Sequence, residues 1–483
     1  MGSGFGKVLV AGAGISGLAA AAALRDADAE VLVSDDRADA LAALPDGVAP
    51  WTGDGLPDGV HTVVTSPGRR PDHPLVAQAH AAGAEVIGEP ELAWRLGRAS
   101  SNPPAWLVVT GTNGKTTTTE MLAAILHAAG LSSVACGNIG YPVVSAVASA
   151  GPRYEVLAVE LSSFQLYWSP SVHPAAGVVL NVAEDHLDWH GGMAGYSSAK
   201  AHALVGDVAV AGADDAVAAA LLAGAPAPRK AGVTLGEPGP DQLGVVDGML
   251  VDRAFGGGDL LPADAVVPPG PPGVTDALAA AALARAYGVD AGTIGKALAE
   301  FTPGPHRSAP VGEHDGVRYL DDSKATNPHA TDAALAAVTA RSPGAKAVWV
   351  VGGLLKGVAP EVLGELAAKH SALLAGAVVI GTERAPIVEA LTRHAPGLPV
   401  QEVTGGHDGA MVPSSERDTP APSTPADTPA DPMPEAVRRA AALAGPGDVV
   451  LLAPAAASMD QFRDYGHRGD AFAAAVAALG ETP

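Results

Sequence analysis

The chain has 483 residues, of which 48% are hydrophobic and 4% aromatic, and its formal net charge is −23. This length suits about three domains of ~150 residues each. The negative charge disfavours nonspecific binding to nucleic acid or anionic lipid, because their phosphates would be repelled. The single cysteine excludes an intrachain disulfide. We find no signal peptide and no apolar run of ~18 residues, so we expect a cytoplasmic protein without membrane insertion.

The first third of the chain predicts a nucleotide-binding crevice. Gly12–Gly17 follows a short apolar strand and precedes an Ala- and Leu-rich helix, and a second strand, 30–34, leads into Asp35. This G-x-G-x-x-G spacing, with an acidic residue about 20 positions further on, is typical of dinucleotide-binding βαβ units. A further strand, 61–65, leads into the turn Ser66-Pro67-Gly68, at the edge where such sheets bind ligands. The pattern does not specify hydride chemistry, and the glycines could serve only close helix–strand packing.

The stretch 106–130 predicts a triphosphate-binding loop. An apolar run, 106–109, is followed by the polar loop Thr110–Thr116, by apolar residues at helical spacing from 117 to 129, and by a capping glycine. In such a turn the backbone N–H groups and the helix N-terminus face the phosphates, the lysine adds charge, and the threonine hydroxyl can hold Mg²⁺. The leading glycine of the usual eight-residue pattern is displaced to Gly111. A Gly-rich turn without a ligand is the alternative.

Polar side chains at the ends of the following strands predict the remainder of this site. Glu160 ends an apolar strand, a position typical of Mg²⁺ ligands in nucleotide-binding sheets. The next strand runs into Glu184–Asp188, where His186 lies among three acids. We expect a catalytic or metal-binding role for this cluster, whereas a lone histidine would be read as a surface residue. Asn138 follows a strand and could equally be a buried structural amide, and Lys200 has the setting of an ordinary helix lysine.

The last third predicts another sheet of alternating strands and helices, with strands at 317–320, 347–351, 378–381 and 448–452. The loop Asp321–Pro328 combines two acids, a lysine, hydroxyls and an amide, which is too polar for packing, so we interpret it as a site loop. A Pro-rich hinge, 301–310, carries His306 and Arg307. The arginine is either a solvated charge or a group that reaches a nucleotide.

We therefore predict an α/β protein of three domains: an N-terminal Rossmann-like domain, a central ATP-binding domain with a P-loop-type, mostly parallel sheet, and a C-terminal Rossmann-like domain. The predicted bounds are 1–101, 102–302 and 303–483. Residues 405–434 are rich in Pro, Thr, Ala and Asp and nearly free of large apolar side chains. We expect them to form a disordered insertion without a chemical role.

Six motifs together resemble the Mur ligase family, and they span all three thirds of the chain. They are GTNGKTT, ELSSFQL, LNVAEDHLD with Lys200 downstream, HR at the hinge, DDSKATNP, and SMDQF followed by RGD. SKATN and SMDQF point to the D-glutamate-adding branch. The resemblance implies an ATP- and Mg²⁺-dependent amide ligase that adds D-glutamate to UDP-N-acetylmuramoyl-L-alanine in peptidoglycan precursor synthesis. It implies an acyl phosphate intermediate, a uridine nucleotide in place of NAD at the first crevice, and a monomer.

The resemblance also assigns residues to roles. The uridine nucleotide substrate is expected to contact Gly14, Ile15, Ser16, Gly17, Asp35, Asp36, Arg37, Ser66, Pro67, Gly68, Asn138 and His186. The expected ATP-binding residues are Gly111, Thr112, Asn113, Gly114, Lys115, Thr116, Thr117, Asp276, Arg307 and Asp322, with His306 beside them. D-glutamate is expected to contact Lys324, Thr326, Lys356, Ser458 and Tyr465. The implied metal ligands are Thr116, Glu160, His186 and Lys200, the lysine in carbamylated form. The implied catalytic set is Lys115, His186, Lys200 and Arg307.

One stretch departs from the family pattern near the expected adenine site. The family usually carries a His-Asn pair and a later Asn before a late helix of the central domain. Here the segment 271–278 lacks that pair, with Pro272 and Gly273 in its place, and Asp276 replaces the later Asn. We therefore expect different adenine contacts in this chain.

Three other functions stay open from the residues alone. The first is an NAD-dependent dehydrogenase built on Gly12–Gly17, which leaves the Gly-Lys-Thr loop and the acidic cluster around His186 unexplained. The second is a nucleotide-binding module without catalysis. The third is a ligase of the same family that adds a different amino acid.

Overall fold

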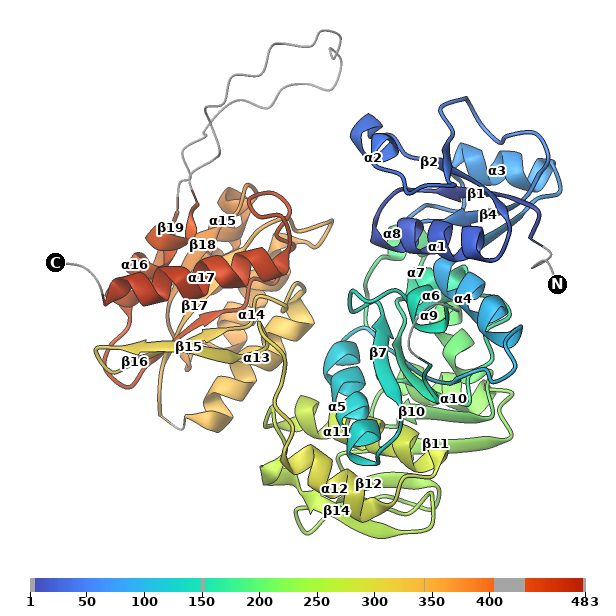
Figure 1. Cartoon of the computed structure of the whole chain (residues 1–483). Helices are drawn as coiled ribbons and strands as arrows, with labels where there is room; N and C mark the ends of the chain where they lie inside the picture. The colour runs from blue at the N-terminus through green and yellow to red at the C-terminus, as the bar shows by residue number, and fades with distance from the viewer. Residues whose placement is uncertain (1–4, 149–152, 343, 404–430, 481–483) are drawn as a thin grey trace, which may run out of the picture. The chain divides into compact units, whose positions relative to one another are not determined.

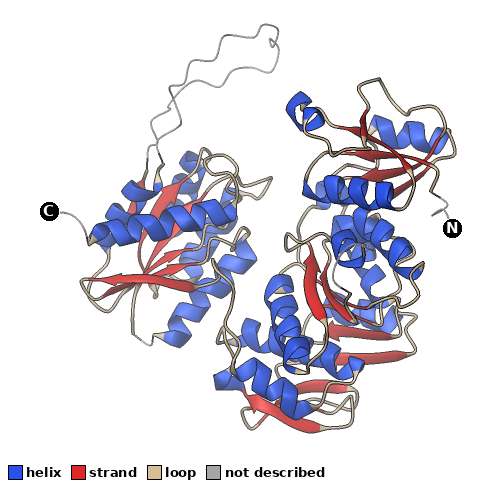
Figure 2. Ribbon diagram, viewed as in Figure 1, coloured by secondary structure: helices blue, strands red, loops and turns tan. Residues whose placement is uncertain are grey.

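The computed structural model describes residues 5–148, 153–342, 344–403 and 431–480. These residues form two compact units, one of residues up to Val267 together with Pro271–Thr302, and one of Pro303 onward together with Pro268–Gly270. The first unit holds two sheets and the second holds one (Figure 1). Most of the strands in all three sheets are parallel and helices flank them, which confirms the predicted α/β class (Figure 2). The predicted disordered insertion, 405–434, falls almost wholly outside the described residues. The helix α16 begins at Met433, within the last two residues of the predicted insertion.

The first sheet has the strand order β3-β2-β1-β4-β5. Its elements are β1 Lys7–Ala11, α1 Ile15–Asp26, β2 Glu30–Ser34, α2 Ala38–Ala42, β3 Ala49–Pro50, β4 Val60–Thr65, α3 Pro74–Ala81, β5 Glu85–Gly88 and α4 Glu89–Arg98. Alternate residues of β1 face opposite sides of the sheet, as strand geometry requires. Val10 packs in one buried cluster with Leu24 of α1, and Leu9 packs in another with Val76 of α3. Both faces are therefore covered, and the loops after β1, β2 and β4 meet at one open edge.

The central sheet has nine strands in the order β14-β13-β12-β11-β10-β9-β6-β8-β7. The strands are β6 Ala105–Thr110, β7 Ser133–Gly137, β8 Val156–Glu160, β9 Ala176–Val179, β10 Val208–Gly212, β11 Arg229–Val233, β12 Gln242–Val246, β13 Met249–Asp252 and β14 Gly258–Pro262. Its helices include α5 Lys115–Ala128, α6 Val143–Val147, α7 Ser163–Tyr167, α8 Leu187–His190, α9 Met193–Ala201, α10 Ala216–Gly224, α11 Pro271–Tyr287 and α12 Ala291–Ala299. The predicted triphosphate loop follows β6, which lies inside the sheet between β8 and β9.

The helix α11 begins at Pro271. Proline is tolerated there because a helix's first N–H groups have no intrahelical acceptor. The segment 271–278, expected to precede the helix, therefore forms its first turns. As a result Asp276 is a buried helix residue.

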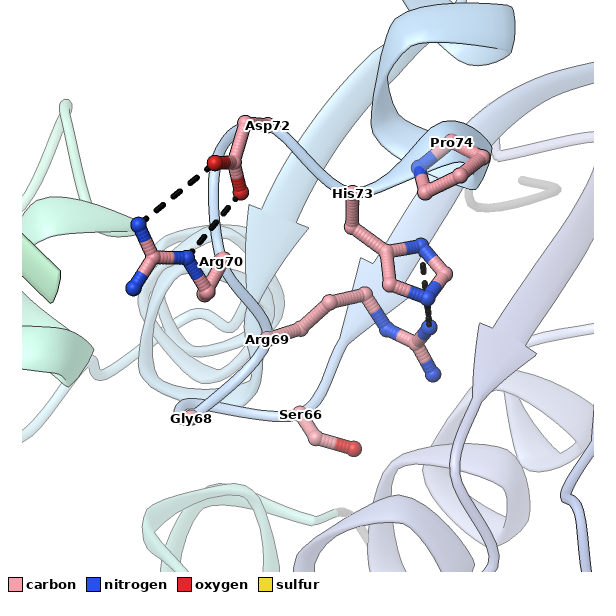
Figure 3. Close-up of a pocket in the computed structure, with 7 residues that line it drawn as sticks. All are labelled: Ser66, Gly68, Arg69, Arg70, Asp72, His73 and Pro74. Carbon is pink, nitrogen blue, oxygen red and sulfur yellow. Dashed lines mark hydrogen bonds and ion pairs between the residues drawn. The ribbon is translucent and has the colours of Figure 1, made fainter. Parts of the chain in front are cut away.

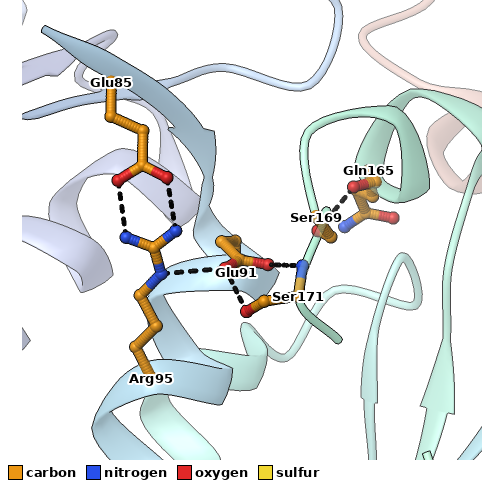
Figure 4. A network of polar contacts seen from close by, with 6 residues as sticks. All are labelled: Glu85, Glu91, Arg95, Gln165, Ser169 and Ser171. Atoms are coloured by element: carbon orange, nitrogen blue, oxygen red, sulfur yellow. Dashed lines mark hydrogen bonds and ion pairs between the residues drawn. The ribbon is translucent and has the colours of Figure 1, made fainter. Parts of the chain in front are cut away.

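The first and central sheets share one hydrophobic core. Val10 of β1 and Val108 of β6 belong to the same buried cluster, together with Leu92 of α4. A polar network adds to this contact (Figure 4). The carboxylate of Glu91 is fully buried and accepts hydrogen bonds from Ser171 N at 2.9 Å, from Ser171 Oγ, and from Arg95 Nε at 2.8 Å. These contacts join α4 to the segment that follows α7 in the central domain.

The second unit contains a six-stranded sheet in the order β15-β16-β20-β17-β18-β19. Its elements are β15 Ala309–His314, β16 Val317–Asp321, α13 Pro328–Arg341, β17 Ala347–Gly352, α14 Pro360–Lys369, β18 Leu374–Ile380, α15 Arg384–His394, β19 Val400–Glu402, α16 Met433–Leu443, β20 Val449–Leu452 and α17 Tyr465–Leu479. Only β15 pairs antiparallel within this described sheet. Trp349 packs toward α13 and α14, whereas Val350 packs toward α16 and α17.

Candidate active site

The loop between β6 and α5 is a tight cradle whose shape depends on glycine. Gly114 caps α5 in the left-handed region, with φ of 84°. A Cβ on this glycine would lie 2.2 Å from Asp276 Oδ1 of α11. Thr118 Oγ1 donates to the same carboxylate oxygen at 3.2 Å. Asp276 therefore packs directly behind the loop, and a side chain at position 114 would be strained as well as obstructed.

Asn181 and Tyr196 hold the loop in place, and neither was among the predicted site residues. Asn181 Oδ1 accepts hydrogen bonds from Thr112 N at 3.2 Å and from Asn113 N at 2.9 Å, and Asn181 Nδ2 donates to Asn113 O at 3.2 Å. The hydroxyls of Thr112 and Tyr196 lie 3.0 Å apart. Asn181 directly follows the buried apolar residues 178–180. An amide at the end of such a segment was the sequence signal that could have identified it.

Two lysines from different helices converge on one carbonyl of this loop. Lys115 Nζ donates to Gly111 O at 3.0 Å and to Thr112 O at 2.8 Å, and Lys200 Nζ donates to Gly111 O at 2.7 Å. Lys200 is only 1% exposed, and no carboxylate among the described residues forms an ion pair with it. Its Nζ lies 4.5 Å from the ring centroid of Tyr196. Burial, and then the charge of Lys115, lower the pKa of Lys200 well below its ordinary value, which favours the neutral, nucleophilic amine.

Glu160 supplies a carboxylate at the same sheet edge. It lies opposite Val109 in the register of β6 and β8 and is completely buried. Glu160 Oε1 accepts a hydrogen bond from Asn138 Nδ2 at 2.8 Å, while Oε2 is buried with no hydrogen-bond partner among the described residues. Such an oxygen suits a hard cation, because an unsatisfied buried carboxylate oxygen is costly. Thr116, a further predicted ligand, lies in the first turn of α5.

The described residues contain no cluster of three or more His, Cys, Asp or Glu side chains arranged for a metal. Two of the four predicted metal ligands, Thr116 and Lys200, are not His, Cys, Asp or Glu. The predicted sites therefore do not require such a cluster. Its remaining member, His186, caps α8 with a left-handed φ of 51°. Its ring centroid lies 4.7 Å from that of Phe164, and Nε2 lies 3.5 Å from Asp185 Oδ1.

The predicted crevice of the first sheet is closely assembled. A Cβ on Gly17 would lie 1.9 Å from Gly12 O, so the turn and α1 approach too closely for any other residue. Ser66 Oγ donates to Ala11 O at 2.8 Å, beside Gly12. At the N-terminus of α1, Gly14 is the N-cap, Ile15 is 73% exposed, and Ser16 follows in the first turn.

Asp35 closes this crevice from β2. Its Oδ2 accepts a hydrogen bond from Ala13 N at 2.7 Å, and its Oδ1 accepts from Arg37 N at 3.0 Å and from Arg37 Nε at 3.1 Å. The Ala13 amide, and then the Arg37 side chain, lower the pKa of Asp35 to about 2. Asp36 is exposed next to it.

A direct contact joins this crevice to the His186 turn within the first unit. Trp189 Nε1, in α8, donates to Gly68 O at 3.0 Å. The turn Ser66–Gly68 is thus held next to the segment that carries His186. The predicted nucleotide-substrate residues of the first sheet and those of the central sheet therefore lie near one another.

The second unit assembles its predicted residues around the loop after β16. His306 Nδ1 lies 2.6 Å from the buried Asp321 Oδ2, and Ser308 Oγ donates to Asp322 Oδ2 at 3.3 Å. Burial raises the pKa of Asp322 to about 7, opposed by Ser308 and by the charge of Arg307. Arg307 is partly buried on the same segment.

The residues predicted for D-glutamate fall into two groups in this unit. Lys324 Nζ lies 4.0 Å from the ring centroid of Tyr465, and Thr326 lies on the same loop as Lys324. The loops that carry Lys356 and Ser458 are held side by side, because Leu354 and Ala457 form a β-bridge. Ser458 is 3% exposed, whereas Lys356 is exposed.

Arg468 links these loops, although no role had been assigned to it. It is 1% exposed, and it donates from Nη2 to Ser323 O at 2.9 Å, from Nε to Ser323 Oγ at 3.0 Å, and from Nη1 to Ala456 O at 3.1 Å. The RGD motif was the available signal. Its arginine serves as an internal clamp in the structure.

The first unit thus combines a strand–loop–helix cradle, on which two lysines converge, with a nucleotide-type crevice, and comparisons with known proteins identify the class of protein. Three family models match: the Mur ligase MurD-like N-terminal domain at residues 6–88, the Mur ligase middle domain at 109–242, and the Mur ligase glutamate ligase domain at 306–456. The chain belongs to the Mur ligase family. In the described residues, no helix has the length and apolar character needed to cross a membrane.

The most similar relatives are named UDP-N-acetylmuramoylalanine–D-glutamate ligase. That of Rhodococcus jostii is 52% identical over 98% of this chain and 95% of its own. Those of Mycolicibacterium smegmatis and Mycobacterium tuberculosis are 51% and 50% identical, over 98% of this chain and 96% of theirs. Among solved structures, the UDP-N-acetylmuramate–alanine ligase of Thermotoga maritima aligns with a TM-score of 0.57 at 19% identity, covering 99% of this chain and 100% of that one. This last likeness concerns the fold alone.

Proposed function

We propose that this chain joins D-glutamate to UDP-N-acetylmuramoyl-L-alanine, with conversion of ATP to ADP and phosphate, in peptidoglycan precursor synthesis. The choice of substrates is supported by relatives that are 50–52% identical over nearly the whole chain. The chemistry is supported by one observation above the others. Lys115, Lys200 and the unpartnered oxygen of Glu160 gather around the loop after β6.

ATP binds, in this proposal, with its phosphates over the N-terminus of α5. The first N–H groups of a helix have no intrahelical acceptors and favour anions. Lys115 moves from the carbonyls of Gly111 and Thr112 to the terminal phosphate. Asp276 and Thr117 border the nucleotide from α11 and α5, and Arg307 and Asp322 are the contributions of the second unit.

Mg²⁺ fits the pair Thr116 and Glu160, because a buried carboxylate oxygen and a hydroxyl are the ligand types it prefers. When bound, it would neutralise charge that develops on the phosphates. We propose His186 and Lys200 for a second ion. Neutral Lys200 adds CO₂ to give a carbamate and a released proton, which converts a cation into an oxygen ligand. The carbamate anion then lies beside the charge of Lys115, since both lysine nitrogens contact Gly111 O.

The reaction proceeds in two steps. The L-alanyl carboxylate oxygen attacks the γ-phosphorus of ATP, the bond to the β–γ bridging oxygen breaks, and an acyl phosphate and ADP result. The neutral amine of D-glutamate then attacks the acyl carbon, the amide bond forms, and phosphate leaves while the amine releases a proton. Lys115 stabilises the anions of both steps, and His186 orients the substrate. The two carboxylates of D-glutamate need cations and hydroxyls, and we propose that these come from Lys324, Lys356, Thr326, Ser458 and Tyr465. The cytoplasmic location and the monomeric state stay predictions.

The test is phosphate release by the full chain with ATP and Mg²⁺, against a panel of UDP-muramoyl substrates and amino acids. We expect release only when UDP-N-acetylmuramoyl-L-alanine and D-glutamate are both present. A higher kcat/KM with another amino acid would make the chain a ligase of different specificity. Binding of both nucleotides without release under any combination would make it a non-catalytic module.

A further inference from the structure

Two cavities open beside the loop that joins β4 to α3, and one arginine lines both. The larger, of about 620 Å³, is lined by Ser66, Gly68, Arg69, Arg70, Asp72, His73 and Pro74 (Figure 3). The smaller, of about 310 Å³, is lined by residues that include Asp35, Asp36, Trp51 and Gln78. Arg69, His73 and Pro74 belong to both linings. The Arg69 side chain therefore lies where the two cavities adjoin.

Arg69 differs from its two neighbouring arginines in having no carboxylate partner. Arg37 pairs with Asp35 at 3.1 Å, and Arg70 pairs with Asp72 at 3.1 Å. Among the described residues Arg69 forms no ion pair. Its Nη1 lies 3.0 Å from Nε2 and 3.3 Å from Nδ1 of His73, and its Nε is buried without a hydrogen-bond partner. Figure 3 shows Arg69 extending toward His73, while Arg70 reaches Asp72 on the other side of the loop.

A partly buried guanidinium of this kind is a site for an anion. Its donors have lost water, and an unpaired buried charge is unfavourable until an anion approaches. Burial, and then the charge of Arg69, lower the pKa of His73 and favour the neutral imidazole, whose Nδ1 accepts a hydrogen bond from Leu75 N at 3.2 Å. The charges of Asp36 and then Asp35 act on Arg69, but neither carboxylate forms an ion pair with it, and Asp35 already accepts hydrogen bonds from Ala13 and Arg37. The unmet donors of Arg69 are thus left for a ligand.

We propose that Arg69 binds the diphosphate of the nucleotide substrate, at the junction of the two cavities. This inference rests on the proposed function, because it assigns a residue to the uridine nucleotide named there. The smaller cavity suits the nucleoside, since it offers the indole of Trp51 for stacking and carboxylates for ribose hydroxyls. The larger cavity leads past Ser66 and Gly68, and the diphosphate is the anionic part of the ligand that reaches Arg69. Guanidinium forms paired, charge-assisted hydrogen bonds to phosphate oxygens.

The experiment measures binding of UDP and of uridine to the full chain by calorimetry, for the wild type and three variants. Arg69→Ala should weaken UDP binding by about 10–100-fold, the usual range for a charge-assisted hydrogen bond, and uridine binding by less than about 3-fold. Arg69→Lys, which keeps the charge but not the planar fork, should give an intermediate loss for UDP. Arg438→Ala, at an exposed arginine of α16 whose charge is paired with Glu435, is the control, and it should change UDP binding by less than about 3-fold.

The possible results separate this inference from the proposed function. Equal weakening of UDP and uridine by Arg69→Ala, or no weakening, would contradict the diphosphate role and leave the ligase function standing. A wild-type chain that binds no UDP would contradict both. Thermal unfolding of each variant checks that the fold is intact. If Arg69→Ala unfolds, Arg69→Lys decides the question: UDP binding at the wild-type level would contradict the inference.

Discussion

The first and central sheets each carry a glycine-bearing turn between a strand and a helix, Gly12–Gly17 and Gly111–Thr116, but only the second contains a cation of its own. In the first turn, the amide of Ala13 is bound by the carboxylate of Asp35. In the second, two amides are bound by the neutral side chain of Asn181, and two lysines meet at one carbonyl. The same backbone motif is thus placed in opposite electrostatic surroundings.

This difference shows how one fold element serves two purposes. The first turn has no cation, so the positive charge for an anion bound there must come from a neighbouring loop. Arg69, on the loop that joins β4 to α3, is such a charge. An anion at the second turn would meet Lys115, the buried Lys200 and an unsatisfied carboxylate oxygen suited to a cation. We propose that the first arrangement holds a nucleotide and that the second also stabilises charge that moves during phosphoryl transfer.

The largest expected effect comes from removing the cation of the second turn. Lys115→Ala should lower the rate of phosphate release on the order of 10³-fold, as for loss of a main transition-state donor, and leave UDP binding unchanged. Lys296→Ala, an exposed helix lysine, is the control. Turnover near the wild-type rate in a folded Lys115→Ala chain would contradict the role of the second turn.

Lys200 should also be essential, but through its carbamate. Lys200→Arg keeps a cation and cannot form the ligand, so we expect a loss of about 10²-fold or more, in the range found for groups that stabilise the transition state. In the wild type, depletion of CO₂ and bicarbonate should lower activity reversibly. Isotope-labelled bicarbonate should give a carbamate carbonyl signal in nuclear magnetic resonance that is absent in Lys200→Arg. Full activity of Lys200→Arg would show that the lysine is only a structural cation.

The two glycines of the first turn should respond differently to the same change. A Cβ on Gly17 meets a backbone oxygen at 1.9 Å, which no side-chain movement can relieve, whereas nothing lies within 4 Å of a Cβ on Gly14. Gly17→Ala should therefore destabilise the chain by about 1–3 kcal/mol, as overpacking does. Gly14→Ala should cost less than about 1 kcal/mol, the loss of a favourable N-cap residue. Thermal unfolding measures both, and equal effects would refute the close approach.

The smallest effect concerns the acid of the first crevice. The pKa of Asp35 in the folded state, about 2, is below its ordinary value of 3.8. The unfolded chain therefore binds more protons between these values, and stability from this group is present above pH ~4 and lost as the pH falls toward 2. Asp35→Asn should cost about 1 kcal/mol at neutral pH, allowing for solvent screening, and less at pH 3. Unfolding in urea at both pH values tests this, and a loss that does not depend on pH would count against the charge.

Much of this arrangement follows from the sequence, because parallel strands bring their carboxyl ends to one edge. The sequence places the loop Gly111–Thr116 and Glu160 at the ends of strands, and the parallel pairing of β6 with β8 brings these ends to the same edge. The same rule was sufficient for the α/β class and for the crevice between Gly12 and Ser66. Strand periodicity and turn residues carry this information locally.

Features that depend on tertiary pairing could not be read from the sequence. Lys200 has an ordinary helix context, and its burial arises from the packing of α9 against the loop after β6. Arg69 has no ion-pair partner because the nearby carboxylates of Asp35 and Asp72 pair with Arg37 and Arg70, which the sequence does not show. The position of Asp276 required knowing that two prolines begin α11. In each case the deciding contact joins residues far apart in the chain.

We propose that the two turns bind two different nucleotides at the same time. The measurement that checks this is calorimetric titration of UDP into the full chain, alone and with a saturating non-hydrolysable ATP analogue and Mg²⁺. We predict one UDP bound per chain in both titrations, and Lys115→Ala should abolish binding of the ATP analogue while UDP still binds. Loss of UDP binding when the ATP analogue saturates the chain would show that the nucleotides compete, and would contradict the division between the two turns.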